Sequence, residues 1–188
     1  TEGAVMHYSF YVPHDIPGLI GAMGGRRAFI QKLDTLFGFH RDGRRDSVCY
    51  YWHGNEPCHH IAYLYALAGE PWKTQRVVSD ILRTEYRDVP GGLSGNDDAG
   101  QMSAWQVFSM LGFYPVCPGS EEYVFGTPSF RRARIGRLTI ETRGGGNGNC
   151  YVLRMTWNGK PYTRYTLSHD MLTNGGHLVI ELGPEPLR

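Results

Sequence analysis

The spacing of the apolar residues changes once along this chain, near Pro118, and this change constrains the fold more than any other feature. Before it, apolar residues recur three and four positions apart, as on one face of an α-helix. After it, apolar and polar residues alternate over short runs, as in β-strands. We therefore predict an α+β fold with helices in residues 1–118 and strands in residues 119–188. The same order would suit two layers cut from a larger assembly.

Four helices are predicted in the first part, because each apolar run has a recognisable start or stop signal. They are expected at about residues 29–37, 59–68, 71–86 and 97–111. Gly38, Gly69 and Gly112 follow three of these runs, as glycine commonly does at a helix end. Asp97 and Asp98 are candidate caps at the start of the fourth helix.

Three strand-like runs are predicted in the second part, at residues 137–143, 151–168 and 177–183. Asn158 and Gly159 interrupt the middle run, and Asn-Gly is the preferred pair in a two-residue hairpin turn. A β-hairpin is therefore expected there.

Charge and cysteine content exclude several classes of function. The 19 basic and 18 acidic residues nearly cancel, so neither nucleic acid nor an anionic membrane is expected as a partner. No apolar run approaches the length of about 18 residues that spans a bilayer. The four cysteines lack the spacing of a zinc ribbon or a redox motif, so buried free thiols are favoured, with a disulfide left open.

Polar residues gather at loop-to-helix junctions, in four segments. These are Glu2, "VPHD" at 12–15, "HGNEP" at 53–57 and "GNDDAGQ" at 95–101. Loops on a rigid scaffold often carry binding and catalytic groups. Acidic residues before a helix are also ordinary caps, and both readings apply to Asp15, Glu56, Asp97 and Asp98.

The segment "HGNEPCHH", residues 53–60, allows either a metal site or the wall of a pocket for a polar ligand. Its histidines do not have the HExxH spacing of a zinc helix, so zinc is disfavoured. The oxygen atoms of Asn55 and Glu56 suit calcium, and they equally suit sugar hydroxyls. His59 and His60 could line the site or be structural.

Two carboxyl groups could serve glycosidic cleavage, which needs one protonated and one ionised carboxyl. A helix N-terminus would hold Asp98 ionised, as a base requires. Glu2 lies near Val5, Met6 and Tyr8, and partial desolvation there would favour the protonated form that an acid requires.

Three long motifs resemble glycoside hydrolase family 92, the calcium-dependent exo-acting α-mannosidases. They are "EGAVMHYSFYVPHDIPGLI", "YWHGNEPCHHIAYLY" and "GNDDAGQMSAWQVFSMLGFYPVCPGSEEYVFGTPSF". The resemblance implies that residues 1–118 are the last helices of an (α/α)6 toroid. Residues 119–188 would then be strands that pack with a β-sandwich domain located earlier in the enzyme.

The resemblance also implies roles for individual residues. Glu2 matches the general acid of the family, and Asp98 matches the base in a G-[ND]-x-D-x-G motif. Asn96 occupies the motif position at which some family members carry aspartate, so the resemblance places it among the expected catalytic residues. Asp97 could partly replace the missing charge.

Further residues are implied as substrate contacts or metal ligands. The expected sugar contacts are Asp15, His53, Asn55, Glu56 and Asp97, and Glu56 and Asp98 are the expected Ca²⁺ ligands.

The implied activity is Ca²⁺-dependent release of terminal α-linked mannose from a glycan, with inversion, by a periplasmic or secreted enzyme. The N-terminal remainder of that enzyme is the expected protein partner. The alternative is an inactive piece that only binds glycan, or only contributes structure, until that remainder is present.

Overall fold

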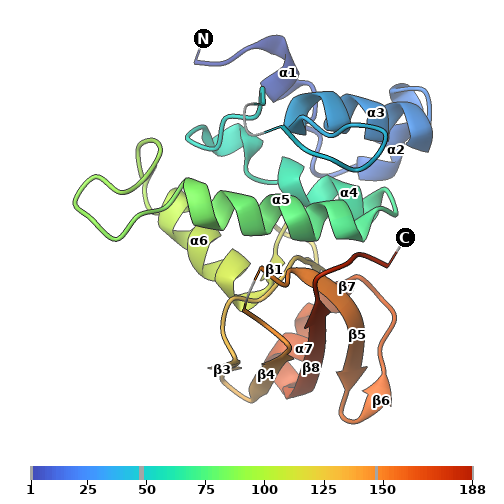
Figure 1. Cartoon of the computed structure of the whole chain (residues 1–188), viewed down its shortest axis with the longest axis vertical. Coiled ribbons are helices and arrows are strands. Elements are labelled where there is room, and N and C mark those ends of the chain that lie inside the picture. Colours follow the sequence, from blue (N-terminus) through green and yellow to red (C-terminus); the bar gives the residue numbers. More distant parts are fainter. Residues whose placement is uncertain (1, 47–48, 147, 188) are drawn as a thin grey trace.

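The structure is a computed structural model that describes residues 2–46, 49–146 and 148–187. Most helices form one half of the molecule and the strands the other, with α5 (Pro71–Thr84) between them and the short helix α7 (His169–Asn174) among the strands (Figure 1). The predicted α+β class is confirmed. Among the described residues, no helix is both long and apolar enough to cross a membrane.

Seven α-helices and two short 3₁₀ turns lie in the described ranges. They are α1 (Val5–Tyr8), α2 (Ile16–Ala22), α3 (Arg26–Phe37), η1 (Glu56–Cys58), η2 (Ile61–Tyr63), α4 (Leu64–Leu67), α5 (Pro71–Thr84), α6 (Gln101–Leu111) and α7 (His169–Asn174).

Three predicted helices are confirmed as α3, α5 and α6. Gly38 and Gly112 end α3 and α6 in the left-handed conformation, which glycine adopts without a steric penalty. Pro71 begins α5, where its fixed backbone angle suits the first helical turn. Glycine and proline therefore mark these boundaries correctly.

The helix predicted at residues 59–68 is wrong in form, because this stretch is divided into η2 and α4 and follows the separate turn η1. The side chains of its two histidines bond to segments outside it. His59 Nε2 lies 2.9 Å from the carbonyl oxygen of His53, and His60 Nε2 lies 2.8 Å from that of Phe10. These bonds hold the stretch against two neighbouring segments and favour tight turns over a continuous helix.

The capping prediction for α6 needs correction. The N-cap residue of α6 is Gly100, and neither aspartate takes that position. Asp97 instead reaches forward into the first turn, where its Oδ1 accepts hydrogen bonds from the backbone N–H and the hydroxyl of Ser103. Asp98 lies in the loop before the helix, with a positive φ of 50°.

Two sheets are described in the strand half. Their strands are β1 (Phe113–Tyr114), β2 (Glu122–Phe125), β3 (Arg132–Ile135), β4 (Leu138–Arg143), β5 (Tyr151–Trp157), β6 (Lys160–Pro161), β7 (Thr166–Ser168) and β8 (Gly176–Gly183). The smaller sheet has the order β1-β2-β7, and the larger has the order β3-β4-β8-β5-β6. All neighbours are antiparallel except β4 and β8.

The predicted hairpin at Asn158 and Gly159 is confirmed. Trp157 pairs with Lys160 across the turn, and both turn residues have a positive φ. The middle strand run, 151–168, is divided into β5, β6 and β7, because it contains this turn and a second irregular stretch.

The helical and strand halves are held together by buried contacts along α5. Most of the core belongs to one apolar cluster, which includes Phe29, Leu33, Val77 and Trp105 and extends to Tyr151 in β5. The side chain of Gln75 on α5 also accepts a hydrogen bond of 3.0 Å from the backbone N–H of Val152. A second cluster contains residues of both sheets, among them Phe125 of β2, Leu167 of β7 and Leu178 of β8.

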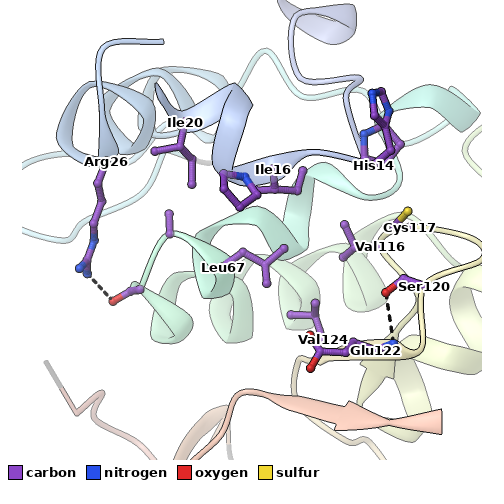
Figure 2. Close-up of a pocket in the computed structure, with 14 residues that line it drawn as sticks. His14, Ile16, Ile20, Arg26, Leu67, Val116, Cys117, Ser120, Glu122 and Val124 are labelled. Carbon is purple, nitrogen blue, oxygen red and sulfur yellow. Dashed lines mark hydrogen bonds between the residues drawn. The ribbon is translucent and has the colours of Figure 1, made fainter. Parts of the chain in front are cut away.

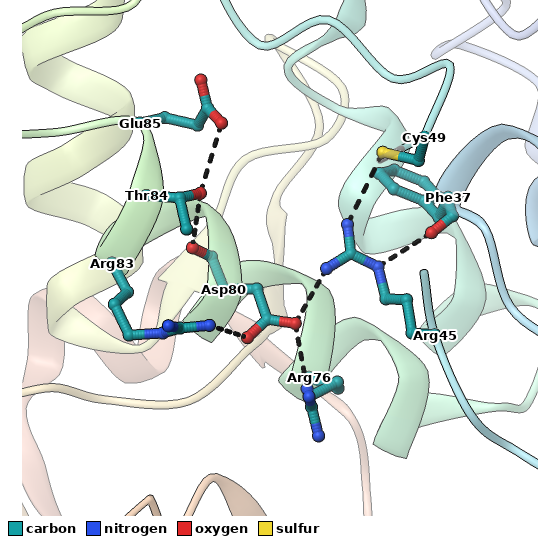
Figure 3. Close-up of polar contacts among 8 residues, drawn as sticks. All are labelled: Phe37, Arg45, Cys49, Arg76, Asp80, Arg83, Thr84 and Glu85. Carbon is teal, nitrogen blue, oxygen red and sulfur yellow. Dashed lines mark hydrogen bonds and ion pairs between the residues drawn. The ribbon is translucent and has the colours of Figure 1, made fainter. Parts of the chain in front are cut away.

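Three arginines converge on Asp80 of α5 and fasten the loop after α3 to that helix (Figure 3). Arg45, Arg76 and Arg83 donate to its carboxylate at 2.8, 2.9 and 3.0 Å. Arg45 also donates to the carbonyl of Phe37 at the end of α3. This contact fixes the path of the chain that leads to residues 49–60.

The four cysteines are free thiols, as favoured from the sequence. Cys58 and Cys150 are buried as expected, whereas Cys49 and Cys117 are only half-buried.

Candidate active site

Residues 2–15 carry the first two predicted segments and are together called the first segment below; the second is residues 53–60 and the third is residues 95–101. The first and second segments contact each other directly. Asn55 donates a hydrogen bond of 3.1 Å to the hydroxyl of Tyr8. His60 reaches the carbonyl of Phe10, and the ring of Tyr11 packs edge-on against the His60 ring. Residues 2–15 therefore lie against residues 53–60, although the bonded residues are 47 and 50 positions apart in sequence.

The second and third polar segments meet through their backbones. A Cβ atom on Gly54 would lie 2.7 Å from the carbonyl oxygen of Ser94 and 3.1 Å from the Cα atom of Gly95. The side chain of Gln101 adds a contact of 3.2 Å to His59 Nδ1. These three segments thus converge on one region of the surface.

A layer of buried histidines and tyrosines supports this region. His53 is 1% exposed, and its ring nitrogens lie 2.9 Å from the hydroxyl of Tyr51 and 2.7 Å from that of Tyr86. Burial, with a smaller contribution from His59, lowers the pKa of His53 to about 2. His53 is therefore a neutral ring that holds the loop from beneath, and both its nitrogens are already bonded.

His59 and His60 belong to the same layer. Burial lowers the pKa of each, so both are neutral at pH 7. His59 donates from Nε2 to a carbonyl and accepts at Nδ1 from Gln101, whose amide also bonds the hydroxyl of Tyr114. The sequence leaves open whether these two histidines line the site. Both rings are buried and bonded to other segments or side chains, so they support the site from beneath.

The predicted acidic and amide side chains lie on the outer side of this layer. Glu2, Glu56, Asn96, Asp97 and Asp98 are all exposed, and only Asn55 is buried. The desolvation expected for Glu2 is therefore absent in this chain, because Val5 beside it is itself exposed.

Both residues predicted to be the acid and the base have strained backbones. Glu2 has a φ of 66° and Asp98 a φ of 50°, and only Ala99 and Asn158 share this property among the non-glycine residues that are described. Non-glycine residues rarely adopt such angles, and they cluster at functional sites when they do. This signal is invisible in the sequence.

Asp15 has a clear local role at the start of α2. Its Oδ1 accepts a hydrogen bond of 2.9 Å from the backbone N–H of Gly18, which is the usual contact of an N-cap. This bond occupies one carboxylate oxygen. The other sequence-predicted role, as a sugar contact, remains a prediction.

The residues predicted to bind Ca²⁺ do not form a complete site in this chain. Glu56 and Asp98 carry the oxygen atoms that calcium prefers, but a calcium site needs about six to eight of them. Among the described residues, no group of three or more His, Cys, Asp and Glu side chains is placed to hold a metal ion. Additional ligands would have to come from backbone, water or another part of the enzyme.

A cavity lies elsewhere, between α2, α4 and the start of the strand half (Figure 2). It has a volume of about 650 Å³, and its walls are mainly apolar, from Ile16, Ile20, Leu67, Val116 and Val124. Of the three converging segments it touches only the end of the first. In the convergent polar region itself, the carboxyl groups of Glu2, Glu56 and Asp98 are exposed.

The structure adds residues that the sequence did not single out as part of the site. Tyr8, Tyr51, Tyr86 and Gln101 all bond the second segment or the histidines beneath it. They lie within or next to the recognised motifs, but their types alone do not distinguish them from core residues.

The sequence and the fold were compared with known proteins. The profile of the glycosyl hydrolase family 92 catalytic domain matches residues 1–184. A protein of Arthroderma benhamiae described as an uncharacterized secreted glycosidase is 35% identical over 192 residues, which cover 98% of this chain and 24% of that protein.

Solved structures of α-mannosidases share the fold. BT3965 from Bacteroides thetaiotaomicron, a GH92 α-mannosidase, is 40% identical with a TM-score of 0.89, over 99% of this chain and 25% of that one. The same enzyme is also solved with mannoimidazole. The inverting mannosidase BT2199 from the same organism is 34% identical with a TM-score of 0.86, over 99% of this chain and 28% of that one. The chain thus spans about a quarter of the length of these relatives.

Proposed function

The chain belongs to glycosyl hydrolase family 92, and on this premise we propose that it supplies part of the active site of an α-mannosidase. The proposed reaction is the release of a terminal α-linked mannose from a glycan with inversion of configuration. The observation that carries the proposal is the convergence of the three polar segments, with Glu2 and Asp98 both in strained backbone conformations.

In the proposed reaction Glu2 is the general acid and donates a proton to the glycosidic oxygen as the bond to the leaving sugar breaks. Asp98 is the general base, which accepts a proton from the water that attacks the opposite face of the mannose. Such enzymes keep the two carboxyl groups about 6.5–9.5 Å apart, so that this water fits between substrate and base.

The remaining residues orient the sugar and the water. Asn96 lies two positions before Asp98 in the same exposed loop and would help to hold the water. Asn55 and Glu56 would bond mannose hydroxyls, and Tyr8 supports Asn55 from behind.

Three further predicted substrate residues differ in how they could act. Asp15 and Asp97 are exposed, although each also bonds its own helix. His53 would act as a positioning residue, because both its nitrogens already bond tyrosines and its side chain is buried.

We propose that the activity depends on Ca²⁺, with Glu56 and Asp98 as the ligands from this chain. When bound, the cation would polarise hydroxyls of the terminal mannose. Among the described residues, no group of three or more His, Cys, Asp and Glu side chains completes its coordination, so further ligands would come from outside this set.

The remainder of the enzyme is proposed to complete the site. Residues 1–118 would be the last helices of an (α/α)6 toroid, and residues 119–188 would pack with a β-sandwich domain. The similarity to a secreted glycosidase supports a secreted or periplasmic location.

One alternative function is a glycan-binding or structural piece without turnover of its own. The exposure of all the candidate carboxyl groups favours this for the chain in isolation, because a glycosidase site normally excludes bulk water.

The test is hydrolysis of α-mannobiose, with the product followed by NMR so that its anomeric form is seen before it equilibrates. The 188-residue chain is assayed alone and together with the family's N-terminal part. Release of β-mannose supports the proposal, and release of α-mannose contradicts inversion. Binding without turnover in either preparation would favour the alternative.

A further inference from the structure

Exposed aromatic side chains gather at the convergent polar region. Tyr11, Tyr50 and Trp52 are 57%, 67% and 40% exposed, and all three belong to the first two segments or to the residues just before the second. Large exposed aromatic rings are a common feature of ligand sites, since they offer an apolar face with a polar edge.

Trp52 lies where the three segments meet. Its indole nitrogen is so close to Gly54 that a Cβ atom there would lie 2.8 Å away, and the same Cβ would lie 3.1 Å from Gly95 Cα. The ring centroids of Trp52 and His7 are 6.3 Å apart. One exposed ring therefore adjoins the first segment, the second and the edge of the third.

His7 connects the residues next to Trp52 to the residues next to Glu2. Its Nδ1 accepts a hydrogen bond of 3.0 Å from the backbone N–H of Ala4, and its Nε2 donates at 2.7 Å to the carbonyl of Tyr50. The ring thus ties the turn directly after Glu2 to the chain directly before Trp52. Trp52 is therefore associated with the segment that carries the acid.

The general acid of a glycosidase lies beside the glycosidic oxygen, on the side of the leaving group. We propose that Trp52 is a specificity-determining residue that stacks against the sugar on the leaving-group side of the scissile bond. One face of a pyranose ring is lined by C–H groups, and the exposed indole face complements it, while nearby carboxylates and amides can bond its hydroxyls. The inference rests on the proposed function and extends it to substrates with at least two sugars.

The experiment compares α-mannobiose with α-mannosyl fluoride, whose leaving group is too small to reach Trp52. In the intact enzyme, Trp52→Ala is expected to lower kcat/KM for α-mannobiose by about three- to tenfold, mainly through KM. Turnover of the fluoride is expected to change less than about twofold, and Trp52→Phe should retain most of the disaccharide activity. Tyr165→Ala is the matched control, because Tyr165 is also exposed (44%) but lies in the strand half.

Equal losses on both substrates would overturn the inference, because they would indicate a structural role or a contact with the terminal mannose. No loss on either substrate would overturn it too. If the wild-type protein hydrolyses neither substrate, the proposed function fails, and calorimetric binding then decides the role of Trp52. The inference requires α-mannobiose to bind more tightly than methyl α-mannoside, and Trp52→Ala to abolish that preference.

Discussion

Gly54 and Gly95 meet so closely that a methyl group on Gly95 would lie 2.5 Å from the carbonyl oxygen of Gly54 and 2.7 Å from its Cα atom. Neither glycine has a positive φ, so the requirement is for space and not for an unusual backbone angle. The two loops that carry Glu56 and Asp98 can therefore approach only because both positions lack a side chain.

Replacing Gly95 with alanine is expected to separate these loops and to destabilise the protein by about 1–3 kcal/mol, the usual cost of overpacking. Sugar binding should weaken at the same time. Gly21→Ala is the control, because Gly21 lies in α2 with no atom within 4 Å, and alanine should there stabilise the helix by about 0.5–1 kcal/mol. Urea unfolding measures both changes. Equal stability of Gly95→Ala and the wild type would show that the loops do not depend on this contact.

The acid and base roles predict different responses to the leaving group. Glu2→Gln should lower hydrolysis of α-mannobiose by about 10²–10⁴-fold but spare α-mannosyl fluoride, whose leaving group needs little protonation. Asp98→Asn should lower both, since the attacking water still needs a base. Asp88→Asn, an exposed change in the loop before the third segment, is the control. A Glu2→Gln variant that loses both activities equally would not fit an acid.

Chelation is expected to abolish hydrolysis in the intact enzyme, and added Ca²⁺ to restore it. Glu56→Gln should raise the Ca²⁺ concentration needed for half-maximal activity, because it removes one charged ligand. Glu121→Gln provides the control, since Glu121 is exposed in the strand half. Full activity in excess chelator would contradict the proposed Ca²⁺ dependence.

The buried histidines predict a loss of stability in mild acid. The pKa of His53 in the folded protein is about 2, well below the value near 6.5 of an unfolded chain, so unfolding takes up a proton below about pH 6.5. The neutral His53 ring therefore contributes its full stabilisation above that pH, and this stabilisation declines as the pH falls. The free energy of unfolding should drop by up to about 1.4 kcal/mol per pH unit for each such histidine.

Urea titrations between pH 7.5 and 5 measure this slope. His53→Asn should reduce this slope by the amount that corresponds to one proton, about 1.4 kcal/mol per pH unit. His14→Asn is the matched control, because His14 is an exposed histidine. His59 and His60 should keep part of the slope in the variant, because burial lowers their pKa values too. A free energy of unfolding that is constant across this range would show that these rings take up protons as readily in the folded protein as in the unfolded chain.

Asp80→Asn is expected to destabilise the protein by about 3 kcal/mol, because it leaves the guanidinium of Arg45, only 13% exposed, without its partner. Burial acts to raise the pKa of Asp80, but hydrogen bonds from Arg76 and Arg83 outweigh it and lower the pKa. The stabilisation is thus complete above about pH 4 and disappears as the pH falls through the lowered pKa.

Thermal unfolding at pH 7 checks this substitution. Asp42→Asn is the control, because Asp42 pairs with Arg44 in an exposed salt bridge whose loss should matter little. If both substitutions lower the unfolding temperature equally, Asp80 contributes no more to stability than an aspartate in an exposed salt bridge.

Local signals in the sequence predicted the elements whose boundaries depend on backbone chemistry. Gly38 and Gly112 end helices in left-handed conformations, and Asn158 forms a hairpin turn with Gly159, as their residue types require. The short helix α7 was missed, although Ser168 caps it through a bond to the N–H of Met171. Its six residues are too few to produce a clear apolar period.

Long-range pairing could not be predicted in this way. Residues 59–68 have a helical apolar pattern, yet they are divided into turns, and the His60 side chain bonds the carbonyl of Phe10, 50 positions away. In the candidate site, too, the sequence predicts some features and the fold alone shows the others. The motifs identified the acidic side chains, but the support from buried tyrosines and the positive φ of Glu2 and Asp98 appear only in three dimensions.

The order of strands in the larger sheet has a consequence for biosynthesis. The central strand β8 pairs with β4 on one side and β5 on the other, yet it follows both in the chain. A ribosome therefore releases β3, β4, β5 and β6 before the strand that joins them exists. Until residue 183 emerges, each of these hairpins has an open edge, a known hazard for aggregation. Chaperone protection during this interval would shield the open edges of β4 and β5 until β8 pairs with both.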